Sequence, residues 1–194
     1  QVGKTTLLKQ ILESKKELEA VDVNKNSIFD IASLTKPLCT ALMTGILIDQ
    51  GMLSFETKIA EIFEDYSISY NKDLDSVNIQ QLLNNSSGLE PWFGLYTLVN
   101  NRSDAYMLTR TRPIYYKPGT RHVYSDLGYI MLGEIIEIIL QNKLNIIFDK
   151  FISSPLGLEK IFFIPDNDKK NNYSFVSTGY SKNRDKELIG EVND

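Results

Sequence analysis

The sequence predicts one globular domain that is mainly helical, with short extended segments, on three observations. Its 194 residues are enough for one domain with a substantial core. Hydrophobic residues make up 42% and charged residues 24%, which are ordinary proportions for a globular protein. Apolar residues recur at helical spacing in several segments, and glycine or proline separates these segments.

The element order begins with a segment, residues 1–27, that leaves two interpretations open. Leucines at helical spacing favour a helix, whereas Val2 favours the end of a sheet strand. Gly3-Lys4-Thr5-Thr6 resembles the end of a phosphate-binding loop, but the glycine and strand that such a loop needs would precede Gln1. We therefore do not expect nucleotide binding here.

The first strong helix is predicted over residues 33–50, after a short apolar segment at 28–31. Pro37 falls in its first turn, where a missing N–H costs no hydrogen bond. Gly51 is a natural C-terminal stop. Apolar residues lie on most sides of this helix, so we expect it to be central to the core.

The remaining elements follow from the same signals. Further helices are expected over Ile59–Phe63, Ile79–Leu83, Leu127–Asn142 and Leu144–Ile152. Asp126 is expected to cap the helix that follows it. Pro118-Gly119 predicts a tight turn, residues 120–124 an extended piece and residues 161–164 a strand. The tail from Asp166 is polar and is predicted to be a loop.

Charge and cysteine content exclude several classes of protein. The net charge is -4 and no run of Lys or Arg exceeds two, so we expect no nucleic-acid partner. No stretch approaches the ~20 apolar residues that cross a bilayer, so we expect no transmembrane span in these residues. Cys39 and His122 are the only residues of their types, so neither an intrachain disulfide nor a metal cluster is expected. We expect no cofactor.

Ser33-Leu34-Thr35-Lys36 is the candidate nucleophilic motif. A serine hydroxyl barely ionises near neutral pH, so it needs a neighbouring base and a site for the oxyanion. At positions i and i+3 of a helix, the Lys36 amine would lie beside the Ser33 hydroxyl. Burial would lower the pKa of Lys36, which would let the amine accept the proton. The alternative is a capped helix with a surface lysine, but the apolar context of residues 29–37 favours catalysis.

Tyr124-Ser125-Asp126 is the second candidate element and lies about 90 residues further on. A tyrosine here could reach the nucleophile from a second side and relay its proton to the leaving group. Asp126 could orient Lys36 or contact the substrate, which makes it the candidate substrate-binding residue. The alternative is that Tyr124 is a core aromatic residue and Asp126 only a helix cap.

Four segments resemble successive blocks of the serine β-lactamase family, in its branch of class C β-lactamases, D,D-peptidases and esterases. They are Phe29–Pro37, Leu82–Leu89, Lys117–Leu132 and Pro155–Leu158, in the family's order. The resemblance implies that Ser33 is acylated and that Lys36 and Tyr124 share its activation. It also implies an α+β fold of the β-lactamase/D,D-peptidase type, in which a helical region, residues 28–164, carries these residues and packs on an antiparallel sheet.

Departures from the family pattern bear on the mechanism. The tyrosine motif most often ends in Asn in the family, whereas here it ends in Asp126. The charge of Asp126 could hold Lys36 protonated, which favours Tyr124 as the base, and both residues remain candidates for that role. The family's Leu-Leu-Thr-His-Thr-Ser-Gly-Leu is here Leu-Leu-Asn-Asn-Ser-Ser-Gly-Leu, and Gly88 is kept. Gly190-Glu-Val-Asn-Asp194 resembles a Gly-x-Val-His-Asp segment of an esterase-like subgroup.

The third family motif, Lys-Thr-Gly or His-x-Gly on a strand, does not occur after Asp126. We therefore expect residues 165–194 to be a polar loop leading to C-terminal strands that these residues lack, and the natural chain to extend past both ends. Most of the sheet would then be missing, and residues 1–194 alone would be insoluble or molten and catalytically inactive. The resemblance also implies a periplasmic or extracytoplasmic location.

The expected activity is that of a serine hydrolase whose partner is a small-molecule or peptide substrate, either an ester or a D-amino-acid amide. A β-lactam hydrolase and a non-catalytic binding scaffold remain alternatives. His122 suggests a Ser-His-Asp triad, but a structural histidine is favoured, since the resemblance gives it no chemistry. Trp92, Phe93 and Tyr96 either line a substrate cleft or pack in a loop.

Overall fold

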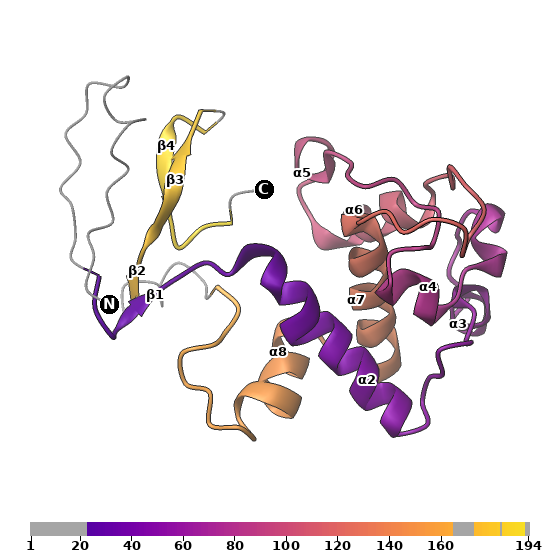
Figure 1. Cartoon of the computed structure of the whole chain (residues 1–194), viewed down its shortest axis with the longest axis horizontal. Coiled ribbons are helices and arrows are strands. Elements are labelled where there is room, and N and C mark those ends of the chain that lie inside the picture. Colours follow the sequence, from indigo (N-terminus) through magenta and orange to yellow (C-terminus); the bar gives the residue numbers. More distant parts are fainter. Residues whose placement is uncertain (1–22, 165–172, 183, 193–194) are drawn as a thin grey trace. The chain divides into compact units, whose positions relative to one another are not determined.

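The computed structural model describes residues 23–164, 173–182 and 184–192 (Figure 1). Its contacts divide the chain between Leu34 and Thr35 and again between Gly157 and Leu158. Unit 2 is the continuous segment Thr35–Gly157, and unit 1 holds the described residues on either side of it. Gly3-Lys4-Thr5-Thr6 and both interpretations of residues 1–22 fall outside the described residues.

Unit 2 is entirely helical apart from its loops and one isolated bridge between Lys58 and Asn78. In chain order its elements are the π-helix η2 (Lys36–Ala41), α2 (Leu42–Asp49), α3 (Ile59–Asp65), the 3-10 helix η3 (Lys72–Ser76), α4 (Ile79–Leu83), α5 (Leu95–Leu98), α6 (Arg102–Arg110), α7 (Asp126–Leu140), α8 (Leu144–Phe148) and the π-helix η4 (Asp149–Ser153).

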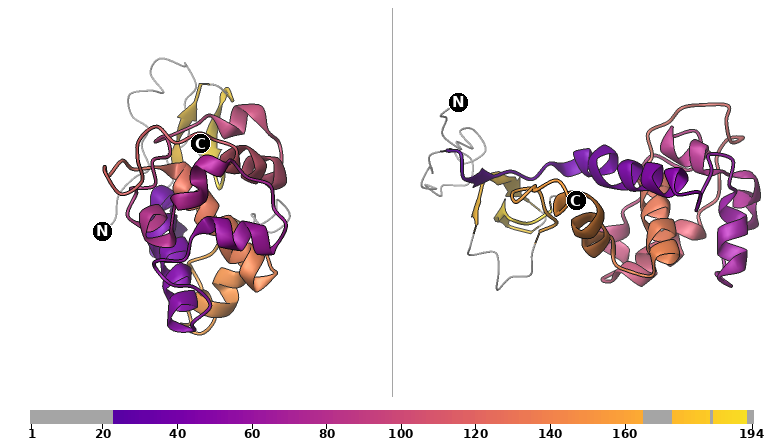
Figure 2. Two further views of the ribbon diagram at one scale, coloured as in Figure 1. Left: turned by 90° about the vertical axis from the view of Figure 1, so that its right-hand side faces the viewer. Right: turned by 90° about the horizontal axis from the view of Figure 1, so that it is seen from below.

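The core of unit 2 is built around α7. This helix contacts η2, α2, α4, α6 and α8, and Figure 2 shows these helices gathered about it. Its Met131, Leu132 and Ile135 are fully buried, as are Met43 and Leu47 of α2. Each such side chain contributes about 1.5–3 kcal/mol on burial. Asp126, the first residue of α7, is therefore held on a rigid helix.

The helix expected over residues 33–50 is wrong in two respects. It consists of a 3-10 turn, η1 (Ala32–Leu34), followed by η2 and α2, so its winding changes twice. Pro37 does fall at the start of η2, as predicted. The helix is also not covered on most sides, because Leu38 and Leu42, one helical turn apart, are exposed.

Other helix predictions were closer. α4 has the predicted bounds, and α3 begins at the predicted residue. The cap of α7 is Ser125, whose Oγ accepts the Gly128 N–H at 3.3 Å, so the prediction of Asp126 as the cap is wrong. Thr120 N–H donates to the Lys117 carbonyl at 3.2 Å, which closes the predicted Pro-Gly turn. The helices η3, α5 and α6 were not expected.

Unit 1 contains the strands of the described chain. β1 (Ser27–Ile28) pairs in parallel with β2 (Ser174–Phe175), and β3 (Ser177–Ser181) pairs antiparallel with β4 (Lys186–Ile189). The tail expected to be a loop therefore contains a hairpin, and that prediction is wrong. Residues 161–164 form no strand, contrary to prediction, although Phe162 packs its ring 4.5 Å from that of Tyr173.

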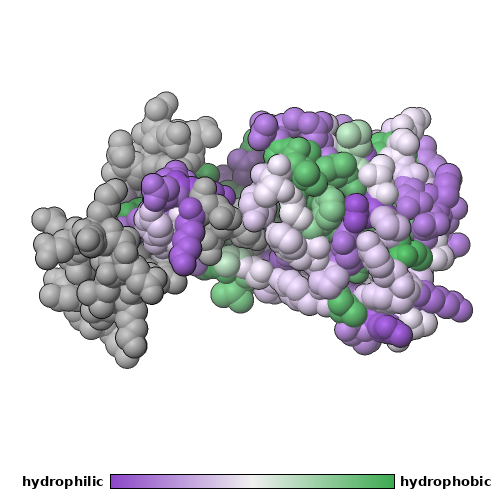
Figure 3. All heavy atoms as spheres, turned by 90° about the horizontal axis from the view of Figure 1, so that it is seen from above, coloured by the Kyte–Doolittle hydropathy of each residue, from purple (hydrophilic) through white to green (hydrophobic). Residues whose placement is uncertain are grey.

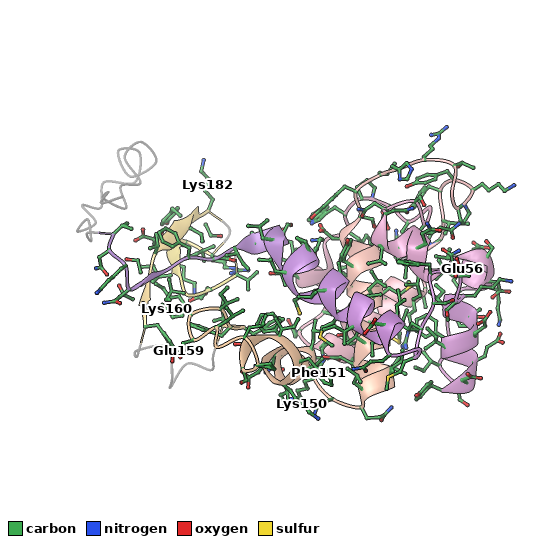
Figure 4. The ribbon with its side chains drawn as sticks, turned by 60° about the horizontal axis from the view of Figure 1, so that its bottom comes forward. Glu56, Lys150, Phe151, Glu159, Lys160 and Lys182 are labelled. Carbon is green, nitrogen blue, oxygen red and sulfur yellow. The ribbon has the colours of Figure 1, made fainter. Side chains whose placement is uncertain are left out.

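Lys160, labelled in Figure 4, ties this unit together. Its Nζ donates to the Lys25 carbonyl at 2.9 Å and to Asn26 Oδ1 at 3.0 Å.

On unit 2, hydrophobic residues gather in one area among more polar neighbours (Figure 3). Within residues 23–164, 173–182 and 184–192, no helix has the length and hydrophobicity that a bilayer crossing requires.

Candidate active site

Ser33 is presented by the short turn η1. Asp30 Oδ1 accepts the Ala32 N–H at 2.7 Å, and the Leu34 N–H donates to the Ile31 carbonyl at 2.9 Å. Ala32 has φ +46°, a left-handed conformation that costs an alanine about 1–2 kcal/mol. The turn is thus held by a side-chain bond against its own strain, and it leaves Ser33 exposed.

Lys36 is the first residue of η2, and its amine meets the tyrosine motif. Its Nζ lies 2.6 Å from Asp126 Oδ1 and 5.1 Å from the centroid of the Tyr124 ring. The Lys36 side chain is 17% exposed and that of Asp126 28%. Two segments about 90 residues apart in the sequence therefore form one cluster in unit 2.

The charge state of Lys36 differs from the one predicted for a buried amine. Burial opposes the ammonium form, but the hydrogen bonds and charges of Asp126 and then Tyr124 outweigh it, so the pKa of Lys36 is raised above its ordinary value of 10.5. Burial alone lowers this pKa, as predicted, but the net direction is upward, which is the outcome expected from the charge of Asp126. Lys36 is therefore a cation at neutral pH.

Tyr124 is about half exposed and is held through its neighbours in the chain. Ser125 Oγ donates to the Glu90 carbonyl at 2.6 Å, and the Asp126 N–H donates to the Pro91 carbonyl at 3.0 Å. These bonds fasten the tyrosine motif to the loop that follows the Ser-Ser-Gly-Leu turn.

Gly88 explains why that turn survives the changes around it. It has φ +90°, and a Cβ there would lie 2.4 Å from the Tyr116 carbonyl oxygen, so any side chain would displace the backbone. The Gly88 carbonyl accepts the Tyr115 N–H at 2.8 Å. The glycine therefore lets two backbone segments lie side by side next to the tyrosine motif.

The other candidate residues have structural contacts. His122 Nδ1 lies 3.0 Å from the Asn84 carbonyl, so this nitrogen carries the proton and donates. Phe93 packs under the Arg112 guanidinium at 3.9 Å, whereas Trp92 and Tyr96 are exposed, with ring centroids 6.3 Å apart. Within the described segments, no three His, Cys, Asp or Glu residues group as metal ligands would.

The structure thus brings Lys36, Tyr124 and Asp126 together within unit 2. Ser33 belongs to unit 1, so the spacing of its hydroxyl from the amine and the phenol stays a prediction. Asn85 and Glu90 also hold the tyrosine motif, and neither was predicted from the sequence. The only available signal was the change from His to Asn at position 85 of the family pattern.

Known proteins of the β-lactamase type resemble this chain in sequence. A family model described as Beta-lactamase matches residues 10–192. The chain is 28% identical over 159 residues to the "Putative D-alanyl-D-alanine carboxypeptidase" of Escherichia coli strain K12, covering 76% of this chain and 36% of that protein. It is 30% identical over 149 residues to the N-acetylmuramyl-L-alanine amidase of Bacillus subtilis strain 168, covering 72% and 34%.

A solved class C β-lactamase superposes with a TM-score of 0.71 at 22% identity, covering 90% of this chain and 46% of that one. This likeness shows the predicted α+β fold of the β-lactamase/D,D-peptidase type. The chain spans about a third of the length of the two curated relatives and under half of the solved structure. Since the family model covers most of its residues, the chain belongs to the β-lactamase family.

Proposed function

We propose that the protein is a serine hydrolase that forms an acyl-enzyme on Ser33, with an ester or a D-amino-acid amide as substrate. The observation that carries the proposal is the cluster of Lys36, Tyr124 and Asp126, with 2.6 Å between the amine and the carboxylate. Family membership supplies the second support, since Lys36 and Tyr124 of this cluster match the family's motifs.

In this proposal Lys36 acts as a fixed cation. A carboxylate at 2.6 Å and a raised pKa leave its ammonium unable to accept a proton near neutral pH. The ammonium instead stabilises negative charge on its neighbours, among which is the Tyr124 oxygen. Tyr124 then has the role of base, as the change from Asn to Asp126 in the motif suggested.

The chemical step follows from these roles. Tyr124 acts in the proposal as a phenolate: it takes the proton as Ser33 Oγ attacks the substrate carbonyl. It returns that proton to the alcohol or amine that leaves as the bond to the carbonyl carbon breaks. The phenolate then takes a proton from water, whose oxygen attacks the acyl-Ser33 ester. Tyr124 passes this proton to Ser33 Oγ as the bond to the acyl carbon breaks, which releases the acid and restores the serine hydroxyl. The Lys36 ammonium compensates the negative charge on the phenolate throughout the cycle.

The substrate class rests on the names of the relatives. One is named as a carboxypeptidase for D-alanyl-D-alanine and another as an amidase of an N-acetylmuramyl-L-alanine bond. Both reactions break an amide by acyl transfer, the chemistry that an activated serine performs. A β-lactam is also a cyclic amide, so the test has to separate it from the linear substrates.

A hydrolysis panel tests the proposal. The full-length protein is assayed with a short-chain aryl ester, a D-Ala-D-Ala peptide and a cephalosporin, each beside Ser33→Ala. Turnover of the ester or the peptide that falls about 10⁴-fold or more in the variant supports the proposal. Selective turnover of the cephalosporin would instead identify a β-lactamase. Turnover that persists in Ser33→Ala above a tenth of the parent rate would refute Ser33 as the nucleophile.

A further inference from the structure

Asn85 holds the residues on both sides of Tyr124. Its main-chain carbonyl accepts the Val123 N–H at 2.8 Å, and its side-chain Oδ1 accepts the Ser125 N–H at 3.0 Å. One residue therefore supplies both acceptors, one on each side of the tyrosine. All of these residues lie within unit 2.

Two hydrogen bonds, at Val123 and at Ser125, restrict the orientation of the segment around Tyr124 more than one hydrogen bond would. In extended backbone, the N–H groups of residues i−1 and i+1 point to the same side of the chain, and the side chains of successive residues point to opposite sides. Anchoring Val123 and Ser125 to one partner therefore prevents the segment from rotating about its own axis. That rotation is the movement that would swing the Tyr124 ring away from Lys36, whose Nζ lies 5.1 Å from the ring centroid.

The backbone of Asn85 is suited to this task. Its φ is +59°, the left-handed region, where asparagine is more readily accommodated than most residues other than glycine. The residue lies two positions after the last residue of α4, and its N–H donates to the Leu82 carbonyl at 3.2 Å. The Leu82 side chain is fully buried. The clamp, meaning Asn85 with its two hydrogen bonds to the Val123 and Ser125 N–H groups, is therefore attached to the helical core and not to a free loop.

We infer that Asn85 is a positioning residue for Tyr124, acting through the Val123 and Ser125 amides. The inference rests on the proposed function, in which Tyr124 is the base. Displacing a catalytic group by about 1 Å costs on the order of 10²-fold in rate, so losing one of the two anchors should be visible in kcat.

Three substitutions separate the parts of the clamp. Asn85→Gly keeps the left-handed backbone and the main-chain carbonyl but removes the bond to the Ser125 N–H. Asn85→Asp keeps an acceptor at the same place. Gln141→Gly is the matched control, because Gln141 is also a non-glycine residue in the left-handed region after a helix, with φ +50°, at the far end of α7.

The inference predicts that Asn85→Gly lowers kcat by about 10- to 100-fold with little change in KM, that Asn85→Asp restores most of it, and that Gln141→Gly leaves it unchanged. Hydrogen exchange of the Ser125 amide should be faster in Asn85→Gly and protected in Asn85→Asp. Equal kcat in Asn85→Gly and the parent, or equal losses in Asn85→Gly and Gln141→Gly, would overturn the inference.

The exchange measurement separates this inference from the proposed function. If Ser33→Ala remained active while the Ser125 amide still lost protection in Asn85→Gly, the clamp would stand and the nucleophile would be wrong. If Ser33→Ala were silent but Ser125 protection did not change in Asn85→Gly, the clamp would be wrong and the nucleophile would stand.

Discussion

Glu134 provides a quantitative test of the packing between α6 and α7. Its carboxylate is buried and lies 2.9 Å from Arg110 Nη1, and its second oxygen has no hydrogen-bond partner among the described residues. Burial raises the pKa of Glu134 to about 7, against the opposing attraction of Arg110. The ordinary value is 4.5.

The size of the effect on stability follows from the difference between the pKa of Glu134 in the folded protein, about 7, and its ordinary value of 4.5. The folded protein binds this proton more tightly than the unfolded chain, so the stabilisation is complete below about pH 4.5 and is lost as the pH rises through about 7. At about 1.4 kcal/mol per pH unit, the contribution is about 3 kcal/mol. Glu134→Gln removes the titration while it keeps the shape and one acceptor oxygen.

Urea unfolding at several values between pH 5 and pH 8 measures the effect in the parent and in Glu134→Gln. The free energy of unfolding of the parent, relative to that of the variant, should fall by most of about 3 kcal/mol across this range. The pH dependence of other groups cancels in the difference. Parallel curves for the two proteins would refute the reasoning, since they would mean that Glu134 titrates alike in both states.

Three further predictions concern the tyrosine motif. Tyr124→Phe should lower kcat by about 10²- to 10⁴-fold in the ester assay, because the base is lost; activity near that of the parent would exclude Tyr124 as the base. Asp126→Asn should lower the pKa of Lys36, since the carboxylate opposes the effect of burial. NMR titration of the Lys36 amine measures this pKa. An unchanged midpoint would show that the Asp126 carboxylate does not raise the pKa. Ser125→Ala should lower the free energy of unfolding by about 1–2 kcal/mol, because the α7 cap and the bond to the Glu90 carbonyl are both lost, and a loss below about 0.3 kcal/mol would show that the cap contributes little.

Local signals predicted the elements whose ends are marked in the sequence. α4 has the predicted bounds because Asn78 and Gln81 form a capping box at its start. The change of winding between η1, η2 and α2 has no comparable signal, since residues 33–50 satisfy one helical pattern throughout. The hairpin β3–β4 was missed because its strands are polar and short, so apolar alternation does not mark them.

Long-range contacts account for most of what the sequence could not predict. α6 was not expected because it is polar, and it is held by pairs to α7, Arg102 to Glu137 at 2.7 Å and Arg110 to Glu134 at 2.9 Å. Such ion pairs join residues that are far apart in the sequence, so no local pattern predicts them.

The candidate site also contains residues that sequence motifs identify and residues whose role depends on long-range contacts. Ser33, Lys36 and Tyr124 could be selected from motifs, and the contact of Asp126 with Lys36 was one of the two roles considered for that carboxylate. The raised pKa of Lys36 agrees with the prediction made from the charge of Asp126 and not with the one made from burial, because the carboxylate lies 2.6 Å from the amine. Asn85 could not be found, because its role exists only where the end of α4 meets the tyrosine motif.

Covalent labelling of Ser33 tests the central claim most directly. The protein is treated with a fluorophosphonate probe, which reacts with activated serines, and the modified peptide is identified by mass spectrometry. Ser154→Ala, which removes another serine hydroxyl remote in sequence from the motifs, is the matched control. We predict one adduct, on the peptide that contains Ser33, present in the parent and in Ser154→Ala and absent in Ser33→Ala. An adduct on another serine, or labelling that persists in Ser33→Ala, would contradict the account.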